Sequence, residues 1–537
     1  MRSLFIYLIL IGPSLTSYGQ WTFTRQDSLR GTLNEFRSNF DVYFYDLTVE
    51  IDPEHKSIQG QNQIYFKAGT DLYKIQLDLF SILNIDSVHY KDQLLRYERE
   101  GNAFFIQFPK LIKKGSLVKI TVFYHGTPIE ASHPPWDGGF IWHKDSIGRD
   151  WIGIACEGLG ASSWWPNKDH LSDEPDSMSI HCIAPSILSA ISNGRLRSKK
   201  EIGYGKTKWS WFVGYPINNY NVSLNLAHYM RFTDAYNNGR DNLDLDYYVL
   251  DYNFKKAKAH FNQVKGMLES FEYYLGPFPF WKDSYKLIEV PYWGMEHQSA
   301  IAYGNEYENN AFGFDFIIIH ESAHEYFGNS VSCSDHAELW IHEAFATYME
   351  ALYLEYHHDF ETSVAYLETQ KQYISNNISI IGPLGVNFNK WQDADMYYKG
   401  SWMLHSIRNT IEDDSLWFTI LFDLYNRYRY SNVNSDDIIN FVNNRTEHDL
   451  LPIFKQYLET TLVPILNYKI NRKRNGIILK YNWSNVVEDF NMPVVVRTDK
   501  GDIKKIFPNP GIQKCNIKDT RDIIFATELY YFQTLER

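Results

Sequence analysis

The sequence predicts a multidomain α+β protein, and three observations lead to this prediction. The chain has 537 residues, which is enough for two to four domains with well-buried cores. Alternating apolar and polar residues fill its first and last parts, as half-buried strands require. Between these parts, apolar residues recur at helical spacing around a His-Glu-x-x-His sequence. We therefore expect two β domains on either side of a helix-rich catalytic domain.

The composition is that of a globular protein and narrows the class of partner. Hydrophobic residues make up 44% of the chain, charged residues 22% and aromatic residues 16%. The formal net charge is −13, from 65 acidic and 52 basic residues. Phosphate binding requires a basic face, so we do not expect nucleic acid as a partner. An acidic surface is compatible with cationic substrates such as free peptide amines.

Residues 1–19 have the features of a signal peptide. Arg2 supplies a positive end, residues 4–11 form an apolar run, and Ser17-Tyr18-Gly19 offers small residues for cleavage. We therefore expect an exported protein, periplasmic or secreted if the source is bacterial. No later apolar run is long enough for a membrane span, and the oligomeric state is not predicted.

The four cysteines do not form a disulfide framework, because four are too few for a chain of this length. Cys156 and Cys182 could form a bridge inside the first domain. Four buried thiols are equally compatible with the sequence.

The first domain, residues 20–238, is predicted to be all β. Alternating runs occur at 45–51, 63–66, 73–79 and 117–124, and turn-rich pieces separate them.

The second domain, residues 239–458, begins with an amphipathic helix over 257–275 that Gly276-Pro277 closes, followed by a strand over 285–290. Further helices complete it. The last domain, residues 459–537, alternates again at 476–481, 493–497 and 522–526, which predicts a small β domain.

The sequence from His320 to Glu343 predicts a metal centre. His320 and His324 are four residues apart, so both imidazoles can point at one ion from one helix face. Glu343 opens a second apolar helix and is the best candidate for the third ligand. Two histidines and one carboxylate leave a coordination position for water, which is the pattern of a catalytic zinc site. The metzincin variant is excluded, because its Gly and His positions hold Phe327 and Ser330.

These residues permit hydrolysis by a zinc-activated water. Zinc lowers the pKa of its bound water toward ~7, and Glu321 is placed to take the proton as general base. An oxyanion donor is also needed, but the residue pattern alone does not choose one among the tyrosines. Tyr397, in Tyr397-Tyr398-Lys399-Gly400, heads a helix of the same domain.

Taken together, these motifs resemble the aminopeptidase N family of zinc peptidases. The likeness rests on His-Glu-x-x-His, the later glutamate ligand, Gly-Met-Glu at 294–296 and Tyr-x-Lys-Gly at 397–400. Trp-Trp-Pro-Asn-Lys-Asp at 164–169, Ser-Asn-Gly at 192–194 and Tyr-Pro-Ile at 215–217 extend it into the first domain. The resemblance implies a saddle-shaped N-terminal β domain, a thermolysin-like catalytic domain and one zinc ion.

The resemblance also assigns roles to further residues. It implies that Glu296, with Gly294 and Met295, binds the substrate's free α-amine, and that Glu157 supplies a second acceptor for it. It implies that Tyr397 stabilises the oxyanion. Two carboxylates at one end of a cleft would hold one ammonium group and so fix the position of cleavage. The expected substrates are peptides with a free N-terminus.

The sequence departs from the family pattern in three places. His297 stands where the family usually has Asn after Met-Glu, and His342-Glu343-Ala344 replaces the usual Asn-Glu-Gly. Neither change alters a ligand or the general base. The predicted C-terminal domain is also too short to supply the large helical domain of longer members. We therefore expect a short form with a more open cleft that accepts longer peptides.

Three other functions compete with the aminopeptidase. A lipid epoxide hydrolase similar to leukotriene hydrolases would need a long apolar pocket. A zinc endopeptidase would cleave peptides whose N-terminus is blocked. A catalytically silent binding protein would keep the fold without the activity, and the intact ligands and Glu321 argue against it.

Overall fold

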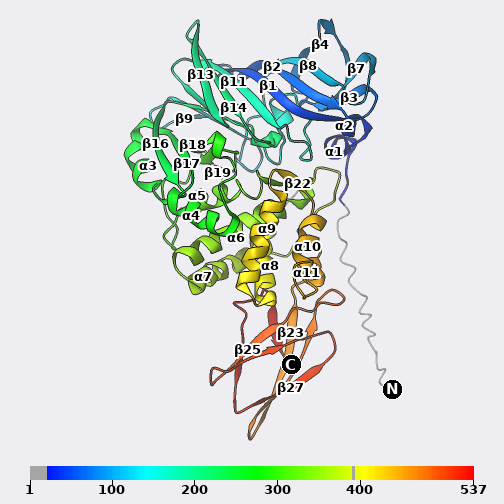
Figure 1. Cartoon of the computed structure of the whole chain (residues 1–537), viewed down its shortest axis with the longest axis vertical. Helices are drawn as coiled ribbons and strands as arrows, with labels where there is room; N and C mark the ends of the chain where they lie inside the picture. The colour runs from blue at the N-terminus through cyan, green and yellow to red at the C-terminus, as the bar shows by residue number, and fades with distance from the viewer. Residues whose placement is uncertain (1–20, 390–392) are drawn as a thin grey trace, which may run out of the picture.

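The computed structural model describes residues 21–389 and 393–537 and confirms the mixed α+β class. Its β-rich N-terminal region, helical middle region and β-rich C-terminal region follow one another along the long axis (Figure 1). The predicted signal peptide lies outside the described residues.

The largest sheet of the N-terminal region has eight strands in the order β13-β14-β11-β1-β2-β8-β4-β5. Buried and more exposed residues largely alternate along β1, because one face of the sheet covers the core. Two short helices, α1 (Arg25–Gly31) and α2 (Glu35–Ser38), precede this sheet. Its strands are β1 (Phe40–Asp52), β2 (Ser57–Ala68), β4 (Leu83–Tyr90), β5 (Gln93–Leu94), β8 (Leu117–Gly126), β11 (Ser177–Pro185), β13 (Arg195–Gly203) and β14 (Lys206–Val213).

Two smaller sheets complete the N-terminal region. One has the order β3-β7-β6, and the other has the order β12-β15-β10-β9. At the end of β10 the chain turns into the loop that carries Glu157, one of the predicted site residues. The strands are β3 (Leu72–Asp78), β6 (Arg96–Glu100), β7 (Ala103–Ile112), β9 (Gly139–Lys144), β10 (Asp150–Ala155), β12 (Ser189–Ser192) and β15 (Leu224–Ala227).

A five-stranded sheet, in the order β16-β17-β18-β20-β19, crosses the predicted domain boundary at residue 238. Strand β16 (Tyr229–Asn237) forms a hairpin with β17 (Asn242–Leu250), and β17 runs parallel to β18 (Tyr285–Glu289). The predicted boundary at residue 238 lies in the turn of this hairpin, and the sheet begins at Tyr229. Strand β20 (Ile301–Tyr303) follows, and β19 (Gly294–Met295) forms the edge.

The helices of the middle region surround a buried pair, α5 (Phe316–Ala323) and α6 (Trp340–His357). Helix α6 packs against α5 on one side and against α7 (Phe360–Gln370) and α8 (Asp395–Ile411) on others. The helix predicted over 257–275 is instead two helices, α3 (Phe254–His260) and α4 (Gln263–Leu275). Residues 261 and 262 form a turn between them. The remaining elements are α9 (Asp414–Tyr428), α10 (Ser435–Asn443), α11 (Leu451–Glu459) and the strand pair β21 (Val331–Cys333) and β22 (Ser431–Val433).

The C-terminal region contains two small sheets, in the orders β27-β24-β23-β29 and β26-β25-β28. It contacts α8 through hydrogen bonds between side chains and backbone, including Tyr530 Oη to Asn409 O at 3.0 Å and Tyr531 N to Ser406 Oγ at 3.0 Å. Its strands are β23 (Ile465–Lys473), β24 (Gly476–Ser484), β25 (Val494–Thr498), β26 (Ile503–Ile506), β27 (Gln513–Lys518), β28 (Ile523–Phe525) and β29 (Gln533–Glu536).

All four cysteines are free, so the bridge between Cys156 and Cys182 is not formed. Among the residues that the structure describes, no helix has the length and apolar character needed to cross a membrane.

Candidate active site

The three predicted metal ligands meet where α5 faces the first turn of α6. Asp315 caps the N-terminus of α5, and His320 and His324 follow one turn apart at its other end. Their Nε2 atoms are 3.3 Å apart, and each lies 3.4 Å from Oε2 of Glu343. Three ligands around zinc at ~2.0–2.1 Å in tetrahedral geometry would be separated by roughly the same distances. The three atoms therefore lie as three corners of a zinc tetrahedron.

Hydrogen bonds on the far side of each imidazole turn the Nε2 lone pairs inward. Nδ1 of His320 donates to Oε1 of Glu350 at 2.7 Å, and Nδ1 of His324 donates to the carbonyl of Phe327 at 3.0 Å. Oε2 of Glu343 is buried and accepts no hydrogen bond from the described residues. Burial would raise the pKa of Glu343, but the two imidazoles hold this pKa well below its usual value. Two neutral imidazoles and one carboxylate fit a zinc ion.

Glu350 supports the site and was not predicted from the sequence. It lies two turns beyond Glu343 on α6, so both carboxylates project from the same helix face. Tyr366 of α7 donates its hydroxyl to the second oxygen of Glu350. The sequence clue to Glu350 was its position seven residues after the predicted ligand Glu343, which puts both on one face of a helix.

Glu321, the predicted general base, lies directly against β19. A Cβ atom at Gly294 would be 2.7 Å from Oε1 of Glu321 and 2.9 Å from Cγ2 of Ile317, so a side chain at position 294 would displace one of them. Burial raises the pKa of Glu321 to about 8, although the neighbouring His320 opposes this. A carboxylate with this pKa can both accept and return a proton near neutral pH.

Tyr397 lies in the first turn of α8 and faces the ligands. Its ring stacks beside that of His320 with 5.9 Å between ring centroids and 29° between planes. Burial raises the pKa of Tyr397 well above its ordinary value, so the phenol keeps its proton as a hydrogen-bond donor.

Two further carboxylates lie near the metal ligands. Glu296 directly follows β19, and its Oε1 accepts a hydrogen bond from Oη of Tyr220 at 2.9 Å. Glu157 lies in the loop after β10. An oxygen of Glu157, an oxygen of Glu296 and a ring nitrogen of His342 all lie within 4.8 Å of one another. Burial raises the pKa of both carboxylates, and the proximity of Glu296 adds to the effect at Glu157. This pair would attract a cation.

The loop of Glu157 is held by residues distant in sequence. The carbonyl of Gly158 accepts hydrogen bonds from Nη2 of Arg30 at 3.0 Å and from Nδ2 of Asn389 at 2.7 Å. Arg30 lies in α1, so the N-terminal helix contacts the candidate site directly. No local motif marks Arg30, and sequence reasoning missed it.

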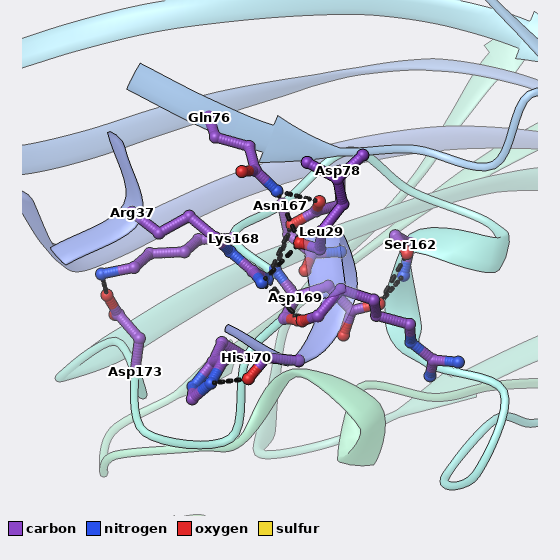
Figure 2. A network of polar contacts seen from close by, with 12 residues as sticks. Leu29, Arg37, Gln76, Asp78, Ser162, Asn167, Lys168, Asp169, His170 and Asp173 are labelled. Carbon is purple, nitrogen blue, oxygen red and sulfur yellow. Dashed lines mark hydrogen bonds and ion pairs between the residues drawn. The ribbon is translucent and has the colours of Figure 1, made fainter. Parts of the chain in front are cut away.

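A buried polar network that includes Arg37, Asp78 and Asp169 anchors this part of the chain (Figure 2). The guanidinium of Arg37 binds Oδ2 of Asp78 at 2.9 Å and the carbonyl of Asp169 at 2.6 Å. The carboxylate of Asp169 in turn accepts from the backbone N of Ser162 at 3.1 Å. The Trp-Trp-Pro-Asn-Lys-Asp motif therefore ties the loop of Glu157 to α2 and β3.

The two histidines that depart from the family pattern are buried and uncharged. Nε2 of His342 accepts a hydrogen bond from the backbone N of Cys333 at 2.8 Å, so the ring proton lies on Nδ1. That Nδ1 and both ring nitrogens of His297 have no hydrogen-bond partner among the described residues. Burial lowers the pKa of each histidine to about 3.

One cavity of about 430 Å³ joins these groups, and all nine predicted site residues line it. They are His320, Glu321, His324, Glu343, Tyr397, Glu296, Glu157, Gly294 and Met295. The fold and the site thus define a protein in which two histidines and a glutamate that could hold a metal ion line a cavity together with further carboxylates.

Comparison with known proteins shows which family the region around this site resembles. Residues 260–457 match the model of the peptidase family M1 domain. The chain is 22% identical over 482 residues to probable aminopeptidase 2 of Sulfurisphaera tokodaii. This alignment covers 82% of the present chain and 57% of the relative. It is 27% identical over 165 residues to aminopeptidase N of Lactobacillus helveticus, covering 28% and 19%. These matches confirm the resemblance to the aminopeptidase N family of zinc peptidases.

Solved structures share the fold. The M1 zinc metallopeptidase of Deinococcus radiodurans matches with a TM-score of 0.67 at 19% identity, over 79% of this chain and 94% of that one. A mutant of that enzyme bound to a Tyr-Ser-Ala substrate matches with a TM-score of 0.66 at 19% identity, over 79% and 95%. The present chain spans little more than half the length of the first aminopeptidase relative, at 57%.

Proposed function

We propose that this protein is a zinc metallo-aminopeptidase that removes N-terminal residues from peptides. One observation carries the proposal above the others: the ligand triad and the pair formed by Glu157 and Glu296 line the same cavity. The triad supports hydrolysis, and the carboxylate pair supports binding of a free ammonium group beside it.

Each residue has a separate task in the proposed reaction. Glu296 and Glu157 bind the α-ammonium group of the substrate and fix the first peptide bond near the triad. A bound zinc ion, held by His320, His324 and Glu343, would supply a water of lowered pKa and polarise the scissile carbonyl. Glu321 accepts the proton of the attacking water and passes it to the leaving amine.

Tyr397 donates its phenolic hydrogen to the oxygen that gains charge as the carbonyl is attacked. Its neutral state at physiological pH supports this role, because an ionised phenol could not donate. Gly294 supports Glu321 by leaving room for its carboxylate.

The carboxylate pair also favours an aminopeptidase over an endopeptidase. A peptide chain continuing past Glu296 and Glu157 would bury both carboxylates without a cationic partner, which costs free energy. A free ammonium group removes this cost. We further propose export of the protein, and acceptance of peptides longer than a few residues.

Metal content and activity together test the proposal. The purified protein should contain one zinc per chain by plasma mass spectrometry. A chelator should remove this zinc and should abolish the release of N-terminal alanine from a tripeptide. Glu321→Gln should retain zinc and lose about 10²–10⁴-fold in kcat, since it removes the general base. His448→Ala, at an exposed position, is the control. Full activity of the Glu321→Gln protein would contradict the proposed mechanism.

A further inference from the structure

A second large cavity lies on the other side of Trp293 from the active-site cavity. It has a volume of about 640 Å³ and lies between the β9–β10 hairpin and the chain beyond the ends of β17, β18 and β20. Trp293 lines both cavities and is 47% exposed. Its ring centroid is 6.4 Å from that of Trp136, which is 67% exposed. The two tryptophans form the rim between the cavities.

The order of residues along β19 gives the direction in which a peptide would lie. Glu296, the proposed amine anchor, directly follows the C-terminal end of β19. At the N-terminal end of the strand, the carboxylate of Glu321 lies against Gly294, and Trp293 directly precedes it. A peptide anchored at Glu296 and cleaved beside Glu321 therefore continues past Trp293. Strand β19 is at the edge of its sheet, so an extended peptide can lie along it.

The second cavity has the size of a binding site for a large side chain, and aromatic residues form part of its wall. Its volume lies within the roughly 300–1,000 Å³ typical of ligand pockets, which are mostly lined by apolar and aromatic groups. Its walls include Trp151, Tyr252, Tyr292 and Tyr307. Tyr252 is 44% exposed, so its ring is accessible from the cavity mouth.

Two acidic side chains, Glu289 and Glu306, are part of the lining of this cavity. Glu289 is buried, and its two oxygens accept hydrogen bonds from the backbone N of Leu250 at 2.7 Å and from Nδ2 of Asn253 at 2.6 Å. It therefore has less capacity to select a cationic side chain. The aromatic side chains of the lining that remain accessible are Trp151, Tyr252 and Trp293, beside the exposed Lys144, Lys256 and Glu306, and such rings can stack with another aromatic ring.

We propose that this cavity is an accessory subsite that binds an aromatic side chain of the substrate peptide at the third residue or beyond. The subsite rests on the proposed aminopeptidase function and adds a substrate class to it: oligopeptides with a downstream aromatic residue. An extended chain advances ~3.3 Å per residue, so the first residue beyond the cut lies near Trp293 and the later ones reach the cavity.

A positional series of pentapeptides tests the subsite. Penta-alanine is compared with four peptides in which one tryptophan replaces alanine at position 2, 3, 4 or 5, and release of the first alanine is followed by mass spectrometry. We expect kcat/KM to rise about tenfold for tryptophan at position 3 or 4 relative to penta-alanine, in line with one buried aromatic contact.

Three variants locate this effect in the cavity. Tyr252→Ala and Ser146→Trp, which respectively remove a wall and fill the mouth, should each abolish the gain, whereas Tyr252→Phe should retain it. Tyr204→Ala, at a fully exposed position in the β13–β14 hairpin, is the matched control and should keep both the gain and the activity. A gain that survives both cavity variants, or no gain at any position, would overturn the subsite.

Hydrolysis of alanine amide separates this result from the function itself. Alanine amide has no residue beyond the scissile bond, so it reports the aminopeptidase reaction without the second cavity. Its hydrolysis together with a flat pentapeptide series would overturn the subsite and leave the proposed function standing. No hydrolysis of any of these substrates by the zinc-loaded protein would overturn both.

Discussion

A Cβ atom placed on Gly294 would lie 2.7 Å from Oε1 of Glu321. Glycine at this edge-strand position therefore decides where the proposed general base can lie. Real carbon–oxygen contacts of this length do not occur between unbonded atoms, so a methyl group there must move Glu321 or Ile317.

We accordingly predict that Gly294→Ala lowers kcat by about 10²-fold while zinc stays bound, because a displacement of about 1 Å at a catalytic group has an effect of this size. Steady-state kinetics and zinc analysis of the same preparation measure both quantities. Gly266→Ala is the control, since its methyl group would meet only the ring of His357, at 3.2 Å. Unchanged kcat in Gly294→Ala would contradict the placement of Glu321.

Glu350→Gln is predicted to weaken zinc binding by about 10–100-fold, as loss of a charged partner behind a histidine ligand does. The carboxylate of Glu350 fixes His320 through a 2.7 Å hydrogen bond to Nδ1. Competition with a chromogenic chelator gives the affinity. Glu361→Gln, at an exposed position on α7, should retain the original value, and an equal loss in both variants would exclude a specific role for Glu350.

The orientation of His342 gives a third prediction. Its Nε2 accepts from Cys333 N, and its Nδ1–H has no partner although a ring nitrogen lies within 4.8 Å of both Glu157 and Glu296. An asparagine can keep a donor near the Nδ1 position, whereas a glutamine can reach only the acceptor position of Nε2. We expect His342→Gln to raise KM for free-amine substrates roughly tenfold, the size of one hydrogen bond to a charged group.

His342→Asn should keep KM near the original value in the same kinetic experiment. Zinc content and melting temperature must be measured for both variants, because position 342 is next to a metal ligand. If both variants raise KM equally while both bind zinc and fold, a hydrogen-bond donor at the Nδ1 position of His342 does not contribute to amine binding.

Acid should lower the free energy of unfolding, because buried histidines gain a proton more readily in the unfolded chain. We use His170 to test this. Burial lowers its pKa from 6.5 to about 4, so the unfolded chain binds this proton first as the pH falls. Its contribution to stability is full above pH 6.5 and decreases as the pH falls toward about 4, by up to ~3 kcal/mol.

His170→Gln removes this titration while retaining polar atoms near Gly31 O and Ser172. Urea unfolding at pH 7 and pH 4.5 should show a smaller loss of stability for this variant than for the original protein. His448→Gln, at an exposed position, should behave like the original. Equal pH dependence in all three proteins would exclude His170 as a source of acid sensitivity.

The sequence predicted the parts of the fold and site that depend on local patterns. The spacing of His320 and His324 follows from helix geometry, and the structure brings these residues to Glu343. The sheet that spans both sides of the predicted boundary at residue 238 could not be predicted, because it depends on pairing between β17 and the distant β18. Arg30 and Glu350 were missed for a similar reason: their partners Gly158 and His320 become neighbours only after folding.

Hydrolysis of an aminoacyl chromogenic amide, beside its N-acetylated form, tests the central claim most directly. The carboxylate pair of Glu296 and Glu157 requires a free ammonium group, so only the unblocked amide should be cleaved. This activity should be lost with a zinc chelator and in Glu321→Gln. Cleavage of the acetylated amide at a comparable rate would contradict the account, because it would remove the amine-binding role from both carboxylates and indicate an endopeptidase.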